Sequence, residues 1–331
     1  MTSSDQVVHT PGVQEIEVDT SFENDSAVGS LEDKLSRYSQ SLTSSVTAYP
    51  VEHGRRYHAY KDGSYIMPND ENEADRLDLL HHMLMILFDG KRIHSPVKRE
   101  NLKRILDAGT GTGIWAIDVG DDYPEAEVIG NDLSPTQPQW VPPNVKFEVD
   151  DIEEPWTHAE PFDLIFSRYM DAAITNWPAL VANMYTHTKP GGWVELQGFD
   201  THYKSDDGSF PADAYINKFV ATLEEGCTKL GKEVYTGPTF AGLLKDAGFV
   251  NVHVQKYKLP LGPWPKDKKM KEIGTVNLMQ VLEGMEAFSY RLFTGTLGWS
   301  LEEVQVLIAK TVKELKTMKF HAYVTYAQKP E

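Results

Sequence analysis

Three glycines at alternate positions follow an acidic residue at the end of an apolar run. Residues 105–106 are apolar, and Asp107 then precedes Gly109, Gly111 and Gly113. Glycine adopts positive φ at little cost and has no Cβ, so the backbone of such a turn can approach a ligand closely. The pattern therefore predicts a turn that binds a cofactor.

The spacing of the glycines distinguishes two classes of cofactor turn. The dinucleotide fingerprint G-x-G-x-x-G needs its third glycine where Ile114 stands, so NAD binding fits this sequence less well. A helix expected from Ile114 to Tyr123 would begin at the turn and direct free N–H groups at the ligand. An ordinary tight connection between a strand and a helix is the structural alternative.

A second acid ends the next predicted strand. Residues 126–132 read AEVIGND, and Asp132 follows Gly113 at close to the spacing of about 20 residues at which a carboxylate binds both ribose hydroxyls. Asp132 is therefore the candidate for the ribose, with Leu133 beside it. A third strand is expected from Val145 to Val149.

Two more strands bring polar side chains to the same edge. Phe162 to Ser167 predicts a fourth strand, after which Arg168 and Tyr169 would lie at the carboxyl edge of a parallel sheet, where ligands of such sheets bind. The turn KPGG at 189–192 precedes a fifth expected strand at 193–196, and a loop is expected over 197–209.

The form D-x-G-x-G-x-G, with the KPGG turn and fifth strand, resembles class I S-adenosylmethionine-dependent methyltransferases. The resemblance implies that the glycines pass beneath the methionine part of the cofactor. It also implies that Asp151 accepts a hydrogen bond from the adenine amino group and that Ile152 covers the ring.

A narrower resemblance covers residues 55–329, which are similar to the fungal LaeA-like methyltransferases of secondary metabolism. The segments that carry it are RRYHAYKDGSYIMPNDENEADRLDLLHH, LDAGTGTGIWAIDVGDDYPEAEVIGNDLSPTQP, VDDIEEPW, KPGGWVELQ and SDDGS. The resemblance implies an α/β fold with a Rossmann-like sheet of seven strands in the order 3-2-1-4-5-7-6, the last antiparallel. It also implies S-adenosyl-L-methionine as cofactor. It implies a role that is either biosynthetic or regulatory. We expect methyl transfer to an oxygen or nitrogen atom of a small molecule, with a regulatory role beside velvet-type protein partners in the nucleus as the alternative.

We therefore expect eleven residues to bind the cofactor: Asp107, Gly109, Gly111, Gly113, Asp132, Leu133, Asp151, Ile152, Ser167, Arg168 and Tyr65. Arg168 could hold the cofactor's carboxylate or orient the substrate, but a pairing with Asp163 or Asp171 is an equal alternative. The ring of Tyr65 could stabilise the sulfonium by cation–π attraction or could simply pack the N-terminal segment.

Methyl transfer is an in-line displacement, so a base is needed only when the acceptor carries a proton that must leave. His202 is the first candidate, because the ordinary pKa of histidine suits proton acceptance at neutral pH. Tyr169 and Tyr203 are the others. A solvated or structural histidine is the alternative for His202.

Composition limits the partners and the compartment. The chain has 32 Lys and Arg against 49 Asp and Glu, a formal net charge of −17, which disfavours nucleic acid and anionic membranes as partners. The single cysteine, Cys227, suits a reducing compartment. We expect neither a signal peptide nor a membrane span, because the sequence shows no basic-then-apolar pattern at its start and no long apolar run. We expect a cytoplasmic protein, with the nucleus as the alternative.

Residues 1–45 predict a disordered acidic tail, because they are rich in Ser, Thr, Asp and Glu. Residues 46–100 predict an aromatic and helical segment that forms part of a lid over the ligand. Residues 101–331 would form the methyltransferase domain, with a helical cap inserted at about 266–318. The remaining expected elements are helices at 71–88, 211–230 and 237–247 and strands at 250–257 and 320–327.

The helix expected at 71–88 contains two adjacent histidines, and their spacing decides whether they could bind a metal together. Asn69 or Asp70 is the expected cap of the helix. His81 and His82 are adjacent and point about 100° apart, so they cannot form the i, i+4 pair of a metal site. No metal is expected, and both histidines are predicted to be structural or at most to line the ligand site.

Overall fold

The computed structural model describes residues 49–58, 65–208, 210–234, 236–316 and 320–327. The tail predicted over residues 1–45 lies outside the described residues. Among the described residues, no helix is both long enough and apolar enough to cross a membrane.

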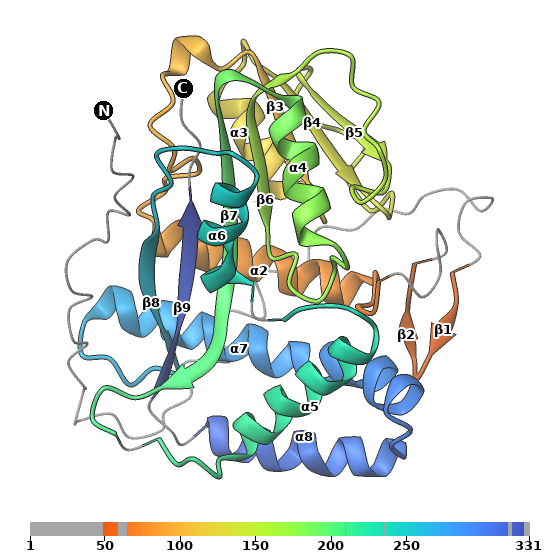
Figure 1. Ribbon diagram of the computed structural model, residues 1–331. Coiled ribbons are helices and arrows are strands. Elements are labelled where there is room, and N and C mark those ends of the chain that lie inside the picture. Colours follow the sequence, from red (N-terminus) through yellow and green to blue (C-terminus); the bar gives the residue numbers. More distant parts are fainter. Residues whose placement is uncertain (1–48, 59–64, 209, 235, 317–319, 328–331) are drawn as a thin grey trace.

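A seven-stranded sheet forms the centre of the molecule (Figure 1). Its strands in spatial order are β5 (Val145–Val149), β4 (Glu127–Asp132), β3 (Arg104–Ala108), β6 (Phe162–Arg168), β7 (Thr188–Lys204), β9 (Phe320–Ala327) and β8 (Gln255–Leu261). The first five are mutually parallel, so five of the seven strands form the central parallel part of the sheet. β9 is antiparallel to both of its neighbours. The Rossmann-like fold is confirmed.

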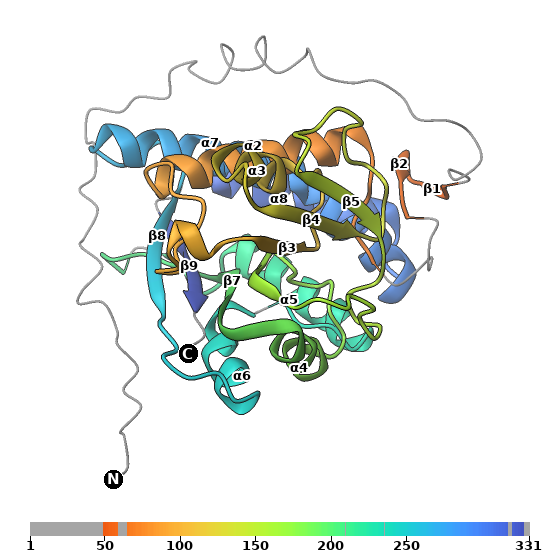
Figure 2. The same ribbon diagram turned by 90° about the horizontal axis from the view of Figure 1, so that it is seen from above.

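Helices cover both faces of this sheet. Successive residues of a strand face opposite sides, and apolar side chains on both sides must be buried against other elements. Ile105 packs in one core with Trp115 of α3 (Ile114–Asp122), while Leu106 packs in the other core with Trp177 of α4 (Trp177–His187). Figure 2 shows α3 on one face and α4 with α6 (Phe240–Asp246) on the other.

A layer of helices covers the end of the sheet toward which β7 runs (Figure 1). It contains α2 (Glu71–Leu87), α5 (Tyr215–Lys229), α7 (Lys268–Arg291) and α8 (Leu301–Leu315). The Asp70 side chain caps α2 by accepting from the Glu73 N–H, as one of the two expected capping residues. A π-helical segment, Leu292–Thr296, interrupts the layer between α7 and α8. The short strands β1 (Val51–Glu52) and β2 (Arg55–Arg56) form a hairpin near α2.

Two expected boundaries are wrong for the same physical reason. β7 does not stop at Leu196 but continues through Lys204, and β8 runs over Gln255–Leu261 rather than 250–257. Both strands pair with β9, which joins Leu196 to Ala327 and Leu261 to Phe320. The ladder partner lies far along the chain, so no local pattern revealed it.

Candidate active site

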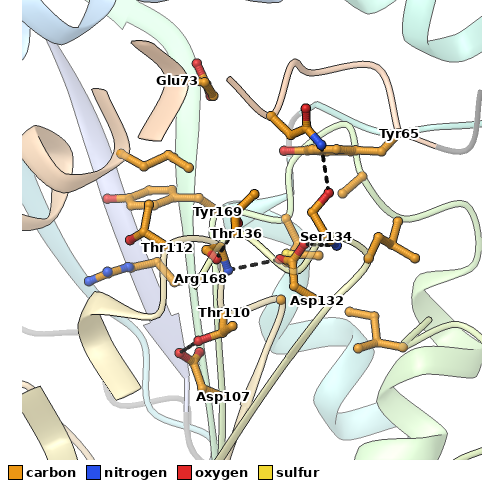
Figure 3. A pocket seen from close by; sticks show the side chains of 18 of the residues that line it. Tyr65, Glu73, Asp107, Thr110, Thr112, Asp132, Ser134, Thr136, Arg168 and Tyr169 are labelled. Atoms are coloured by element: carbon orange, nitrogen blue, oxygen red, sulfur yellow. Dashed lines mark hydrogen bonds between the residues drawn. The ribbon is translucent and has the colours of Figure 1, made fainter. Parts of the chain in front are cut away.

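A cavity of about 160 Å³, named here the cofactor cavity, opens at the carboxyl edge of β3, β4 and β6. The turn after β3 lies on one side and Asp132 of β4 on another, while Arg168 and Tyr169 follow β6 (Figure 3). Tyr65 lies across the cavity from Asp107 (Figure 3). The sheet therefore brings most of the predicted cofactor residues together.

The three glycines of the turn all have positive φ, but for different reasons. A Cβ on Gly111 (φ 59°) would meet only Leu77 Cδ1, at 3.7 Å, so this backbone faces the open cavity. A Cβ on Gly109 would come within 2.4 Å of Met170 Sδ. A Cβ on Gly113 would come within 2.4 Å of Phe147, and Gly113 is not among the cavity-lining residues. Gly113 thus serves the packing of α3 against β5, contrary to its predicted role.

Asp132 ties the end of β4 to the glycine turn. Its Oδ2 accepts from the Gly111 N–H at 2.9 Å, and its Oδ1 accepts from the Ser134 N–H at 3.0 Å. Burial raises the pKa of Asp132 to about 6, although these backbone donors oppose the shift. The carboxylate lines the cavity and has acceptor capacity left for a ligand.

Asp107, in β3, stabilises the glycine turn through a hydrogen bond. Its Oδ2 accepts from Thr110 Oγ1 at 2.6 Å, and burial raises its pKa to about 6. Ser167, which was expected to contact the cofactor, is buried and donates its hydroxyl to the Ala108 carbonyl at 2.8 Å. Ser167 does not line the cavity and instead fixes β6 to β3.

Arg168 is held by a chain of hydrogen bonds that sequence analysis missed. Its Nη2 lies 2.9 Å from His81 Nδ1, and His81 Nε2 lies 3.1 Å from Asp118 Oδ2. Because a guanidinium only donates, Nδ1 of His81 accepts and Nε2 donates. Burial lowers the pKa of His81, which favours this neutral form. Arg168 lines the cavity, and its buried Nη1 has no hydrogen-bond partner among the described residues.

The alternative carboxylate partners of Arg168 are engaged elsewhere. Asp163 accepts from the backbone of Lys103 and Arg104, at 2.9 and 2.8 Å. Asp171 accepts from the Thr236 hydroxyl. The pairing of Arg168 with either acid is therefore wrong.

Residues after β4 and β5 form the far wall of the cofactor cavity. Leu133, Asp151 and Ile152 all line it. Asp151 Oδ1 accepts from the Glu153 N–H at 2.9 Å, which fixes the carboxylate at the start of this loop. The wall thus offers an acid and apolar side chains side by side.

A second cavity, also about 160 Å³, lies beneath α2, α5 and α7, and we name it the acceptor cavity for the role that we propose for it. It shares four lining residues with the cofactor cavity: Tyr65, Leu77, Leu80 and Tyr169. A molecule in one cavity would therefore contact the same side chains as a molecule in the other.

The three candidate bases are placed differently. His202 lines neither cavity, its side chain is 51% exposed, and its nearest carboxylates are Asp200 and Glu224, each 3.7 Å away. Tyr203 lines the acceptor cavity and Tyr169 lines both. His202 and Tyr203 are neighbours on β7 rather than in a loop, and only Tyr203 lines a cavity. The expectation that His202 reaches the reacting atoms is therefore wrong.

The two tyrosines are poor bases at neutral pH. Burial raises the pKa of Tyr203 to about 12 and raises that of Tyr169 above its ordinary range. Tyr169 has φ 56°, and its ring stacks on Phe199 at 4.3 Å between centroids. Asp171, two residues further on, lines the acceptor cavity, although sequence analysis considered it only as a partner of Arg168.

The Rossmann-like sheet, the glycine turn behind an acid and the second acid at the end of β4 define a class I S-adenosylmethionine-dependent methyltransferase. Sequence comparison agrees, because a family described as methyltransferase domain matches residues 74–254.

Three fungal relatives show to which group of these methyltransferases the chain is similar. Methyltransferase pytC of Aspergillus terreus is 43% identical over 88% of this chain and 91% of its own length. Secondary metabolism regulator LAE1 of Cochliobolus heterostrophus is 37% identical over 82% of this chain and 91% of its own. Protein-methionine methyltransferase laeA of Emericella nidulans is 33% identical over 84% of this chain and 76% of its own. The chain belongs to the LaeA-like class I methyltransferases, and S-adenosylmethionine is its cofactor.

Proposed function

We propose that this methyltransferase transfers the methyl group to an oxygen or nitrogen atom of a small molecule of the natural-product type. The observation that carries the proposal is the acceptor cavity, which is covered by helices and shares four wall residues with the cofactor cavity. A covered cavity of this size suits a small molecule. Positioning the acceptor atom about 3–3.5 Å from the methyl carbon, in line with the sulfonium bond, would supply much of the rate enhancement.

We assign the cofactor contacts from the side chains that line its cavity. The Asp132 carboxylate would accept from the ribose hydroxyls, and Asp151 would accept from the adenine amino group with Ile152 and Leu133 on the ring. The unpartnered Nη1 of Arg168 suits the carboxylate of the methionine part. Asp107, Gly109 and Gly111 would lie beneath that part, while Gly113 and Ser167 support the turn from behind.

We assign the lid to the N-terminal segment and the cap to the helices after β8. Tyr65 lines both cavities, and its ring meets that of His58 edge-on at 5.0 Å. The ring can therefore stand beside the sulfonium and keep water from the reacting atoms. Val281 and Met285 of α7 also line the acceptor cavity.

Incubating the pure protein with methyl-labelled S-adenosylmethionine and an extract of its source organism tests the proposal. We expect label in a small molecule that is recovered after the proteins are removed, attached to oxygen or nitrogen. Label found only on protein would contradict a small-molecule acceptor.

A regulatory function is the alternative, because relatives of this chain at 33–37% identity are named secondary metabolism regulators. In that case the protein would act in the nucleus in a complex with a velvet-type protein. A pulldown in which velvet-type proteins dominate, with no labelled metabolite, would favour this alternative.

The affinity for S-adenosylhomocysteine is expected to rise with pH through about 6. Burial raises the pKa values of Asp107 and Asp132 to about 6, and only the ionised carboxylate of Asp132 offers both oxygens to the ribose. Below that pH, ligand binding must displace a proton, so the affinity falls by up to about tenfold per pH unit and per carboxyl. Calorimetry between pH 5 and 8 measures this. An affinity that does not change with pH in wild type would contradict the ribose assignment.

His202→Gln is expected to leave turnover within about two-fold of wild type, as for other exposed positions. The side chain lies outside both cavities, and glutamine keeps its polarity. Turnover with the labelled acceptor from the extract measures this. A loss of a hundredfold or more would restore His202 as the base.

A further inference from the structure

The acceptor cavity contains buried polar atoms that the protein leaves without partners. Tyr169 Oη, Asp171 Oδ2 and Thr201 Oγ1 are buried and have no hydrogen-bond partner among the described residues, and all three residues line this cavity. Most buried polar atoms in proteins are hydrogen-bonded, because an unmet buried donor or acceptor costs about 1–3 kcal/mol. Three such atoms around one cavity indicate that a bound molecule supplies the partners.

Three other polar side chains of the cavity already have partners. Arg76 donates to both oxygens of Glu73, at 2.9 and 2.6 Å, and to Gln280 Oε1 at 2.9 Å. Gln280 in turn donates to Asn277 Oδ1, and Asn277 donates to the Pro260 carbonyl. The buried polar atoms of the cavity without a partner therefore belong to β7 and to the loop after β6.

The rest of the cavity wall is apolar. Leu77 and Leu80 of α2 face it, as do Phe219 and Leu223 of α5 and Phe288 of α7. These side chains suit a hydrophobic body in the bound molecule. The ligand that fits is thus apolar over most of its surface and polar at one end.

Asp171 is held in a fixed position at that polar end. One carboxylate oxygen, Oδ1, accepts from the hydroxyl of Thr236, a residue with no exposed surface. The backbone on either side is held in a left-handed conformation, at φ 56° for Tyr169 and φ 60° for Ala172. Non-glycine residues adopt this conformation at a cost, and such strain often occurs where function fixes a side chain.

We propose that the acceptor is a neutral alcohol or phenol with an apolar body, and that Asp171 Oδ2 takes the proton of its hydroxyl group during methyl transfer. This inference rests on the proposed function. The acceptor oxygen forms a bond to the methyl carbon while the bond from that carbon to sulfur breaks, so the sulfonium becomes the thioether of S-adenosylhomocysteine. The proton moves from the hydroxyl to the carboxylate and then to water.

The charges around the cavity favour a hydroxyl over an anionic group, because a carboxylate ligand would be repelled by Asp171. A hydroxyl can donate to Asp171 and accept from Tyr169 or Thr201 at the same time. A hydroxyl therefore supplies the missing donor for Asp171 and the missing acceptor for Tyr169 or Thr201.

Asp171 also has suitable acidity for this role. Burial raises its pKa to about 6, so it is mostly ionised at neutral pH and accepts a proton more readily than an exposed aspartate does. The other titratable groups that line the cavity are Tyr65, Tyr169, Tyr203, Arg76 and Asp200. Burial raises the pKa of each of these tyrosines, so they stay neutral across the range in which Asp171 titrates.

Binding of three related probes to the protein saturated with S-adenosylhomocysteine tests the ligand class. The probes are 2-naphthol, naphthalene and 2-naphthoate, which share one apolar body and differ in the polar group. We expect 2-naphthol to bind about tenfold or more tightly than naphthalene, and 2-naphthoate most weakly. Absence of 2-naphthol binding, or equal binding of all three, would overturn the inference.

Methyl transfer to 2-naphthol tests the role of Asp171. Asp171→Asn keeps the shape and one acceptor oxygen, and we expect it to lower kcat by about 10²- to 10⁴-fold. KM for 2-naphthol should rise by no more than about tenfold, the effect of one lost hydrogen bond, and the affinity for S-adenosylhomocysteine should change little. The rise of kcat with pH through about 6 should disappear in the variant. Asp121→Asn, which removes the same charge from an exposed position on α3, is the matched control.

The outcomes separate this inference from the proposed function. Wild-type kcat and an unchanged pH profile in Asp171→Asn would overturn the role of Asp171. A labelled small molecule from the extract that carries the methyl group on nitrogen would also overturn the inference, while the proposed function would stand. Label found only on protein would remove both.

Discussion

Gly111→Val is expected to remove detectable binding of S-adenosylhomocysteine. Gly111 has φ 59° and faces the cofactor cavity, where the nearest atom to an added Cβ is Leu77 Cδ1 at 3.7 Å. In the ligand-free protein a valine therefore has room, but its side chain would occupy the space beneath the methionine part of the cofactor. Calorimetry with S-adenosylhomocysteine measures the loss, which we expect to exceed a hundredfold.

The left-handed backbone at Gly111 adds a cost of its own, of about 1–2 kcal/mol for a side chain in that conformation. Gly231→Val is the matched control, since Gly231 has φ 70°, has nothing within 4 Å of an added Cβ and lines neither cavity. We expect both variants to lose similar thermal stability and only Gly111→Val to lose the ligand. Equal ligand affinities in the two variants would contradict the position of the cofactor over the turn.

Local sequence patterns predicted the part of the site that follows strand ends. β5 and β9 have the expected bounds, and the expected cap Asp70 starts α2. Each of these elements depends on near neighbours: an alternating apolar pattern for a strand, or a capping side chain for a helix. The glycine turn and Asp132 were found for the same reason, because their spacing along the chain reflects one strand, one turn and one helix.

The acceptor side of the site depends on contacts between distant segments. β7 continues to Lys204 because β9 pairs with it, and His202 on this extension lines neither cavity. Asp171, in the loop after β6, lines the acceptor cavity only because distant segments fold around it, among them Thr236, whose hydroxyl donates to it, and α7. No spacing rule in the sequence relates these segments.

The contact between His81 and Arg168 shows the same limit. The adjacent histidines of α2 carried no information in the sequence about a partner on β6. Only the packing of α2 across the carboxyl edge of the sheet brings His81 Nδ1 to 2.9 Å from the guanidinium. The apolar residues of α2 indicate a helix that packs in the core. The same helix also positions the polar side chain of Arg168 in the site.

Asp132→Asn is expected to weaken S-adenosylhomocysteine binding by about 10- to 100-fold without unfolding the protein. Hydrogen bonds to a charged group contribute about 1.5–3 kcal/mol, and the substitution removes the charge that would accept from the ribose hydroxyls. The amide oxygen can replace Oδ2 as acceptor for the Gly111 N–H, so the turn keeps one of its anchors. The amide nitrogen, however, would face the Ser134 N–H that now donates to Oδ1 at 3.0 Å, which adds a modest loss of stability.

The pH dependence distinguishes this charge effect from a general disturbance of the turn. Asp132→Asn removes one of the two cavity carboxyls whose pKa is raised to about 6, so the variant's affinity should vary less steeply between pH 5 and 7 than that of wild type. Glu127→Gln removes the same charge from the opposite end of β4, where the side chain pairs with Arg104 and Lys146, and should keep the wild-type affinity and slope. If Asp132→Asn bound S-adenosylhomocysteine as tightly as Glu127→Gln does, the ribose would have to lie away from Asp132.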